Sequence, residues 1–191
     1  MSQIVNIAIF ASGGGSNAEA IIEHFKNVTK GKIALIVTNN PNAGIIQKSK
    51  HFGIPVYVHS KEEESGDALL KLMEDHEIGF IVLAGYLRKV NPELVDTFEG
   101  RIVNIHPALL PKFGGQGMYG MNVHKAVVAA GEKVSGPTIH YVNNHYDEGA
   151  IIEQHEVVLD ANDNAEEVQK KVLQLEHKYY PSAVERLINE L

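Results

Sequence analysis

The sequence predicts an α/β fold built on a doubly wound, mostly parallel sheet, with an antiparallel extension and a long carboxyl-terminal helix. Short apolar runs alternate with amphipathic stretches through the first hundred residues, which is the pattern of strands joined by crossover helices. β-rich runs then follow one another within residues 138–158. A helical pattern of apolar residues occupies residues 165–191.

The first predicted strand leads into a glycine-rich turn. Residues 4–10 have the composition of a buried parallel strand, and Gly13-Gly14-Gly15-Ser16-Asn17 follows them. An amphipathic helix is expected to begin near Ala18, with Ile21 and Phe25 facing inward. Free backbone amides and the positive end of the helix dipole meet at such a turn, so it predicts a seat for an anion. A turn that only reverses the chain is the alternative.

Two nucleotide-binding patterns compete for this turn. A triphosphate-binding loop needs Lys followed by Ser or Thr after its last glycine, and that pair is missing. The looser Rossmann dinucleotide fingerprint fits, but its second strand should end in an acidic residue that binds the ribose. Here the second predicted strand, residues 33–37, ends in Thr38-Asn39-Asn40, with no carboxylate for NAD and no nearby arginine for NADP. A phosphate monoester is therefore the preferred ligand.

The following elements alternate in the same way. Helices are expected at residues 43–52 and 67–76 and after an Asn91-Pro92 cap, and strands at residues 55–58, 80–84 and 102–105. Residues 85–90 leave the carboxyl end of the fourth strand, as the glycine turn leaves that of the first. Ligands of open α/β sheets bind at this edge, so we expect the loops to lie together.

Asn104-Ile105-His106-Pro107 stands at the end of the fifth predicted strand. Asn104 and His106 are two residues apart on an extended backbone, so their side chains point to the same face. Pro107 and Pro111 restrict the backbone that follows. The pair predicts an amide donor and a titratable imidazole on a stiff strand end. A structural histidine beside a strand-end cap is the alternative.

The pattern changes beyond residue 111. The glycine-rich residues 112–120 form either a lid or a plain connection, and a helix at residues 123–130 ends at Gly131. Residues 138–142 and 151–158 are expected to extend the sheet with antiparallel strands.

Two carboxylates of this half are candidate site residues. Asp147 lies in the connection between the two antiparallel strands. Glu176 falls within the apolar stripe of the last helix, whose start carries an Asn164 to Glu167 capping pattern. That stripe is predicted to contain Val168, Val172, Leu175 and Tyr179. A carboxylate there is either paired or used in function, or it lies at the edge of the stripe with its head in water.

Composition narrows the class of protein. The absence of cysteine excludes disulfides, thiolate zinc sites and cysteine nucleophiles, and no paired histidine spacing predicts a metal site. A net charge of -7 argues against nucleic-acid binding through a basic surface. Residues 1–10 have neither the cationic head of a signal peptide nor the length of a membrane span, so the cytoplasm is expected. With no repeat or linker, residues 1–191 are expected to form one domain.

Four segments of the chain carry a combined pattern. They are Ala11-Ser12-Gly13-Gly14-Gly15-Ser16-Asn17, Leu83-Ala84-Gly85-Tyr86-Leu87-Arg88, Asn104-Ile105-His106-Pro107-Ala108-Leu109-Leu110-Pro111 and Tyr146-Asp147-Glu148-Gly149. Together, and in this order over nearly the whole chain, they resemble the folate-dependent phosphoribosylglycinamide formyltransferases of purine synthesis. The Asn-Ile-His-Pro tetrad with a downstream Asp is shared by enzymes that use formyltetrahydrofolate, and the glycine-serine-asparagine turn is typical of this family.

The resemblance implies transfer of a formyl group from 10-formyltetrahydrofolate, a co-substrate, to the primary amine of phosphoribosylglycinamide. Asn104, His106 and Asp147 would be catalytic. The substrate would contact Gly15, Ser16, Asn17, Leu173, Gln174, Leu175 and Glu176, with its phosphate at the first three and its ribose at Glu176. The folate would contact Leu87, Arg88, Lys89, Val90, Asn104, Asn143, Asn144, His145, Tyr146 and Asp147. About residues 1–100 would form the phosphate-binding half and about 101–191 the folate-binding and catalytic half.

The same resemblance implies a mechanism. Asn104 and a protonated His106 would stabilise the oxyanion of a tetrahedral intermediate. Asp147 would raise the pKa of His106 and help to move a proton from the attacking amine to the leaving nitrogen.

The sequence departs from the family at two places. Residues 113–124 carry more glycine and are longer than the family's usual Pro-Gly loop, with Asn122 where a histidine is common. The arginine that the family often places after its third strand is missing from Ser60-Lys61-Glu62-Glu63-Glu64. The resemblance therefore does not define the contacts to the folate tail.

Three rival functions remain at this stage. Methionyl-tRNA formylation usually needs an extra carboxyl-terminal domain and formyltetrahydrofolate hydrolysis an amino-terminal regulatory domain, and we expect room for neither. A non-catalytic nucleotide-binding module would bind a phosphate ester without formyl transfer.

The expected partners are small molecules, with no nucleic acid and no membrane, and the chain is expected to be a monomer or a homodimer.

Overall fold

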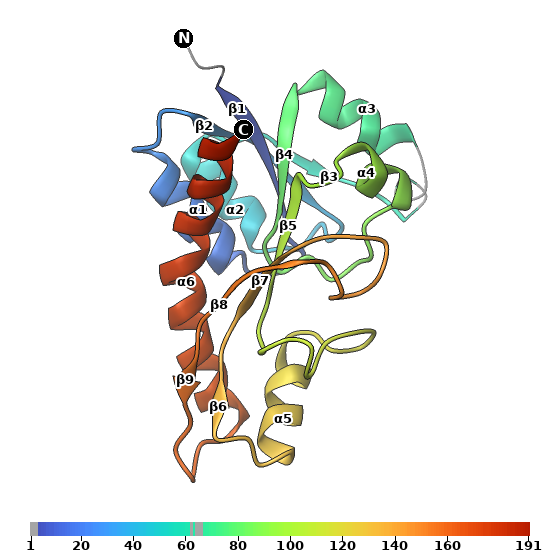
Figure 1. The fold of residues 1–191 in the computed structure, drawn as a ribbon. Coiled ribbons are helices and arrows are strands. Elements are labelled where there is room, and N and C mark those ends of the chain that lie inside the picture. The colour runs from blue at the N-terminus through green and yellow to red at the C-terminus, as the bar shows by residue number, and fades with distance from the viewer. Residues whose placement is uncertain (1–3, 62, 64–66) are drawn as a thin grey trace.

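A seven-stranded sheet forms the centre of the computed structural model, which describes residues 4–61, 63 and 67–191 (Figure 1). Its strands are β1 (Val5–Phe10), β2 (Gly31–Thr38), β3 (Val56–Val58), β4 (Ile78–Leu83), β5 (Ile102–His106), β7 (Thr138–Tyr141) and β8 (Ile151–Gln154). Their order is β3-β2-β1-β4-β5-β7-β8. The first five run parallel, β7 is antiparallel to β5, and β8 is antiparallel to β7. The predicted fold class is confirmed.

Helices cover both faces of the sheet. They are α1 (Ser16–Phe25), α2 (Ile45–Phe52), α3 (Asp67–Asp75), α4 (Pro92–Thr97), α5 (Met121–Ala129) and α6 (Ala165–Glu190). Figure 1 shows α1, α2 and α6 on one side and α3 and α4 on the other. Within the described residues, no helix combines the length and the apolar character needed to cross a membrane.

Side chains of β1 alternate between the two faces of the sheet. Ile7 and Ile9 belong to the apolar cluster beneath α1 and α6. Ala8 and Phe10 belong to the cluster beneath α3 and α4. All four are fully buried. A central parallel strand that is covered on both faces explains why this segment is apolar almost throughout rather than at every second residue.

One predicted strand near the carboxyl terminus was wrong, and one short strand was missed. The expected strand 151–158 is divided, because β9 (Val157–Val158) leaves the main sheet and pairs with β6 (Val134–Ser135) in a separate two-stranded sheet. The backbones cross closely where this happens: a Cβ on Gly136 would lie 1.7 Å from the carbonyl oxygen of His155. Sequence analysis missed β6, which is only two residues long.

The predicted amino-terminal cap of the last helix, α6, is confirmed, but the predicted set of buried residues on the helix is partly wrong. The Asn164 side chain accepts hydrogen bonds from the backbone amides of Glu166 and Glu167, and the Glu167 carboxylate accepts one from the Asn164 amide. The buried positions in the first half of the helix recur every four residues and are Val168, Val172, Glu176 and Tyr180. Leu175 and Tyr179 are only half-buried, so their assignment to the stripe was wrong.

Tyr180 fastens α6 to the sheet. Its hydroxyl lies 2.9 Å from the carbonyl oxygen of Leu83, the last residue of β4, and 3.2 Å from that of Val103 in β5. The side chain is fully buried, which raises the pKa of its hydroxyl well above the ordinary value. Because Glu176 lies one turn earlier on the same face, this contact also positions the helix over the carboxyl edge of the sheet.

Replacing Tyr180 by Phe removes this hydroxyl and retains the ring. We expect the free energy of unfolding, measured by urea denaturation, to fall by about 1–3 kcal/mol because two buried carbonyl groups lose a donor. Tyr179→Phe is the matched control on the half-buried neighbour, and we expect a change within about 0.5 kcal/mol. Equal losses in the two variants would contradict the proposed fastening.

Candidate active site

A cavity of about 520 Å³ lies at the carboxyl edge of the sheet. The strand order reverses between the neighbouring strands β1 and β4: the chain continues from β1 toward one edge of the sheet and from β4 toward the other. Doubly wound sheets bind ligands at the carboxyl ends of the strands beside such a reversal. The predicted site residues that line the cavity are Asn17, Leu87, Arg88, Lys89, Val90, Asn104, His106, Asn143, His145, Tyr146, Asp147, Leu173 and Glu176. The predicted residues outside its lining are Gly15, Ser16, Asn144, Gln174 and Leu175. Segments far apart in sequence therefore meet at one cavity.

The glycine turn has the geometry of an anion seat. Gly15 has φ +69°, and a Cβ there would lie 2.6 Å from Cδ1 of Ile45, so glycine is required for both conformation and space. Gly13 and Gly14 are exposed, with no heavy atom within 4 Å of an added Cβ. Helix α1 begins at Ser16 rather than near Ala18, and no side chain caps its first turn. Its first amides are thus available to an anion.

Asn17 and Glu176 join this turn to α6. The Asn17 amide donates to the Glu176 carboxylate over 2.6 Å. Glu176 is only 6% exposed, and burial raises its pKa while the bond from Asn17 acts in the opposite direction. Glu176 is therefore paired inside the protein, and the alternative of a solvated carboxylate at the edge of the stripe was wrong.

Asn104, His106 and Asp147 come together as the sequence predicted. Nδ1 of His106 lies 3.5 Å from Oδ2 of Asp147, and its Nε2 donates to the carbonyl oxygen of Phe113 over 2.8 Å. The same Asp147 oxygen accepts a hydrogen bond of 2.9 Å from the Gly115 amide. The glycine-rich segment is thus held against the carboxylate and forms part of the cavity wall.

Two residues of this cluster have unusual backbone conformations. Asp147 has φ +56° and Phe113 has φ +57°, in the left-handed region that non-glycine residues rarely adopt. Aspartate tolerates this region better than most residues. Gly114 lies between them in space, and a Cβ there would be 2.6 Å from the Leu110 side chain and 3.3 Å from Asp147 Cβ. Backbone strain at a cavity of this kind is typical of functional sites.

Burial decides the protonation of His106. Asp147 and the carbonyl of Phe113 both favour the charged ring, so Asp147 acts in the predicted direction. However, the side chain is only 3% exposed, and burial outweighs both partners, so the pKa of His106 lies below its ordinary value. The neutral ring is therefore favoured in the free protein at neutral pH, and the imidazolium expected during the reaction stays a prediction.

His140 belongs to the cluster, although sequence analysis missed it. It lies opposite Asn104 in the antiparallel register of β5 and β7. Its Nδ1 lies 2.8 Å from the Tyr141 carbonyl, and the Asn104 amide nitrogen lies 3.1 Å from its Nε2. Burial lowers its pKa, so a neutral ring donates through Nδ1 and accepts the Asn104 amide at Nε2. The amide of Asn104 is thereby oriented.

His124 is a second histidine that sequence analysis missed. It lines the cavity from α5 and is buried, and its Nδ1 has no hydrogen-bond partner among the described residues. Burial, helped by the nearby His106, lowers its pKa to about 4. Within the described part of the chain, no three His, Asp or Glu side chains are grouped so as to hold a metal ion.

The segment that lacks the expected arginine lies beside the main cavity. Glu62 and Glu64 fall outside the described residues. Ser60, Lys61 and Glu63 line a second cavity of about 370 Å³. Arg88 lines both cavities, so a ligand that extends out of the main cavity would pass this segment.

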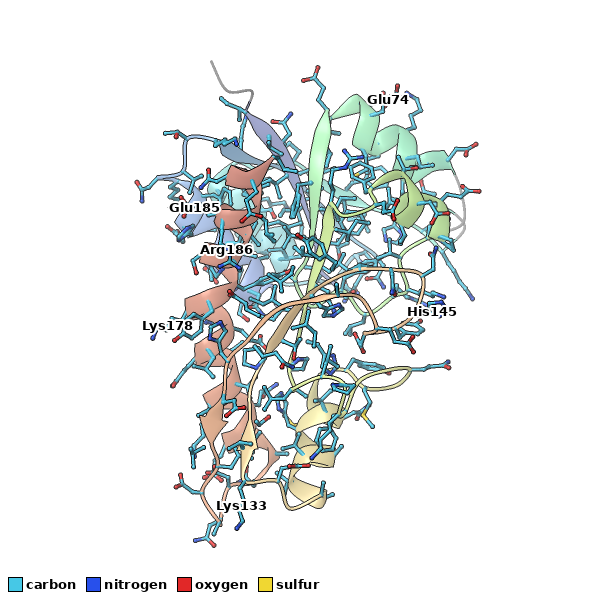
Figure 2. The ribbon with its side chains drawn as sticks, viewed as in Figure 1. Glu74, Lys133, His145, Lys178, Glu185 and Arg186 are labelled. Atoms are coloured by element: carbon cyan, nitrogen blue, oxygen red, sulfur yellow. The ribbon has the colours of Figure 1, made fainter. Side chains whose placement is uncertain are left out.

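Figure 2 shows His145 on the long loop between β7 and β8, away from α6 in this view.

Fold and site together define a class of protein: a doubly wound α/β protein with a phosphate-type turn and an amide, imidazole and carboxylate cluster at one sheet edge. A family model described as formyl transferase matches residues 5–184. The chain belongs to the formyl transferase family.

Individual relatives are similar over nearly all of this chain. It is 46% identical over 190 residues to the chloroplastic phosphoribosylglycinamide formyltransferase of Vigna unguiculata, covering 96% of this chain. It is 37% identical to the phosphoribosylglycinamide formyltransferase of Bacillus subtilis, covering 95% of this chain and 93% of that protein. The crystal structure of phosphoribosylglycinamide formyltransferase from Bacillus halodurans superposes with a TM-score of 0.87 at 38% identity, covering 96% of this chain and 95% of that one. The chain spans only 61% and 65% of the plant relatives from Vigna unguiculata and Arabidopsis thaliana.

His124 predicts a measurable loss of stability in acid. Its pKa is about 4 in the folded protein and near 6.5 in the unfolded chain, so the unfolded chain takes up a proton first as the pH falls. Between pH 7 and pH 5, we expect the free energy of unfolding of the wild type to fall by about 2 kcal/mol more than that of His124→Gln. Urea denaturation at both pH values measures this difference.

The control for this experiment is His51→Gln, because His51 is exposed on α2. We expect this variant to show the same pH dependence as the wild type. A His124→Gln variant that loses as much stability as the wild type between the two pH values would rule out His124 as the source.

Proposed function

We propose that this protein is a phosphoribosylglycinamide formyltransferase that uses 10-formyltetrahydrofolate as its formyl donor. The observation that carries the proposal is the meeting of Asn104, His106 and Asp147 at a cavity that Asn17 and Glu176 connect to the glycine turn. An anion seat at one end and a cluster of proton-transfer groups in the middle suit an amine substrate that carries a phosphate ester. The names of the relatives support the same activity.

The substrate would bind along the side of the cavity formed by α1 and α6. Its phosphate would accept hydrogen bonds from the first amides of α1, at Gly15, Ser16 and Asn17, where no side chain caps the helix. Its ribose hydroxyls would reach Glu176, whose buried carboxyl group already pairs with Asn17. Leu173 lines the cavity one turn before Glu176, whereas Gln174 and Leu175 lie outside the lining.

The folate would bind between the loop after β4 and the loop after β7. Residues 87–90 line one wall, and Asn143, His145 and Tyr146 line the other. Leu87 and Tyr146 present exposed apolar surface, and the Lys89 ammonium group lies 5.6 Å from the centre of the Tyr146 ring. A cavity of about 520 Å³ whose lining combines apolar side chains with many polar groups can take a ligand that has both a ring system and polar substituents.

In the reaction, the lone pair of the substrate amine attacks the formyl carbon, and the carbonyl electrons move to oxygen. The Asn104 amide is oriented by His140 and retains an N–H group that can donate to this oxyanion. His106 starts neutral, and the developing negative charge favours its protonated form.

Asp147 supports this change of protonation. The amine proton leaves through the His106 and Asp147 pair and reaches the folate nitrogen as its bond to the formyl carbon breaks. The carboxylate compensates the charge on the ring while the proton is in transit, and its contact with the Gly115 amide keeps it in place.

The compartment and the oligomeric state stay predictions. The cytoplasm suits a chain without cysteine, but two plant relatives carry the word chloroplastic in their names. Small molecules remain the expected partners, with no nucleic acid and no membrane, and a monomer or homodimer remains the expected assembly.

A substrate-omission assay tests the proposed function. Purified protein is mixed with 10-formyltetrahydrofolate, and the deformylated folate is followed by its ultraviolet absorbance with and without phosphoribosylglycinamide. We expect product only when both substrates are present. Product without the amine would indicate a hydrolase, transfer only to methionyl-tRNA would indicate a different transferase, and phosphate-ester binding without product would indicate a non-catalytic module.

In the same assay, Asp147→Asn and His106→Ala should each lower kcat by about 100-fold or more. Asparagine tolerates the left-handed backbone and keeps an acceptor for the Gly115 amide, so we expect Asp147→Asn to fold normally. Asp160→Asn is a matched control, because this exposed carboxylate pairs with Lys171 away from the cavity. Turnover near the wild-type value in either site variant would remove that residue from the mechanism.

A further inference from the structure

Ser12 connects three loops without lining the cavity. It lies two residues after the end of β1, precedes the glycine turn and is only 6% exposed. Its backbone amide donates to the Gly85 carbonyl over 3.0 Å, and its hydroxyl accepts a hydrogen bond of 2.9 Å from the Leu87 amide. The start of the loop after β4 is thus attached at two points to the residue that begins the phosphate turn.

The end of β2 supplies the other contacts of Ser12. The Ser12 hydroxyl donates to Oδ1 of Asn39 over 2.6 Å, and the side-chain amide of Asn40 donates to the Ser12 carbonyl over 3.1 Å. Dinucleotide-binding proteins of this fold carry the ribose-binding carboxylate at the end of the same strand. In this protein, Asn39 and Asn40 at that position are hydrogen-bonded to Ser12 and hold it in place.

The contact with Leu87 determines the position of a cavity wall. Leu87 lines the proposed folate pocket. The residue is 52% exposed, so its side chain packs little against the rest of the protein. The Ser12 hydroxyl holds the Leu87 backbone amide, whereas the neighbouring Tyr86 is held by its ring packing against Phe10 and its hydrogen bond with His59. Without the Ser12 hydroxyl, the exposed loop can turn the Leu87 amide toward water and leave its position with little loss of global stability.

We propose that Ser12 is a positioning residue for the formyl donor. Its hydroxyl holds the Leu87 backbone at a fixed place beside the phosphate turn. Ser12 touches neither substrate, and it acts on the co-substrate through Leu87. This inference rests on the proposed function, because the ligand of residues 87–90 is taken to be the folate.

The test compares steady-state kinetics of Ser12→Ala with those of the wild type. We expect KM for 10-formyltetrahydrofolate to rise about tenfold, while kcat and KM for phosphoribosylglycinamide stay within about threefold, because the loss of one hydrogen bond to a loop affects one subsite. Ser12→Thr retains the hydroxyl and should restore most of the donor affinity.

Ser49→Ala is the matched control. Ser49 is a fully buried serine on α2, and its hydroxyl has no hydrogen-bond partner among the described residues. Removal of a buried serine hydroxyl as such should leave both KM values unchanged. Should Ser12→Ala fail to fold, Asn39→Ala provides a second probe, since it removes the acceptor that orients the Ser12 hydroxyl, and we expect a smaller rise in the donor KM.

The outcomes separate this inference from the proposed function. A wild-type protein that shows no formyl transfer refutes the proposed function and the inference with it. An active wild type whose Ser12 variants bind the donor normally refutes only the inference. Equal rises in both KM values, or a loss of kcat without a change in donor KM, would also overturn it.

Discussion

The Asp147 carboxylate is the contact on which the arrangement of the site depends. It faces His106 and accepts the Gly115 amide, and its other oxygen lies 3.7 Å from Nε2 of His140. Asp147 therefore lies where the end of β5, the antiparallel strand β7 and the glycine-rich segment 112–120 meet, and its hydrogen bond is to the last of these. The backbone of Asp147 is left-handed, and the Gly115 amide holds its carboxylate in place.

Two opposing effects act on the histidines of this cluster. Burial removes water from the rings and favours their neutral forms, whereas Asp147 favours the charged form. Burial prevails in the free protein, so His106 and His140 both have pKa values below the ordinary value. A neutral His140 can accept the Asn104 amide, and a neutral His106 can gain a proton as negative charge develops nearby. Burial therefore has two consequences. It keeps His140 neutral, so that His140 orients the Asn104 amide, and it keeps His106 neutral, so that His106 can take up a proton.

Sequence reasoning succeeded where one local pattern determined the structure. The apolar run of β1, the two-residue spacing of Asn104 and His106, and the capping box at Asn164 each depend on neighbouring residues alone. It failed where distant segments determined the outcome. His140 joined the site only through the register between β5 and β7, which no local pattern specifies. The phase of α6 was set by its packing against the sheet through Tyr180, and the division of β8 and β9 by the close approach of Gly136 to His155.

The pKa of His106 in the free protein tests the balance between burial and Asp147 most directly. It can be measured by following the imidazole signals with pH in nuclear magnetic resonance spectra, with the His106 signal assigned from its absence in His106→Gln. We expect the pKa of His106 to lie below 6.5 in the wild type and lower still in Asp147→Asn, because that variant loses the charge that favours the protonated ring. A wild-type pKa at or above 6.5, or a pKa that rises in Asp147→Asn, would show that burial does not outweigh Asp147.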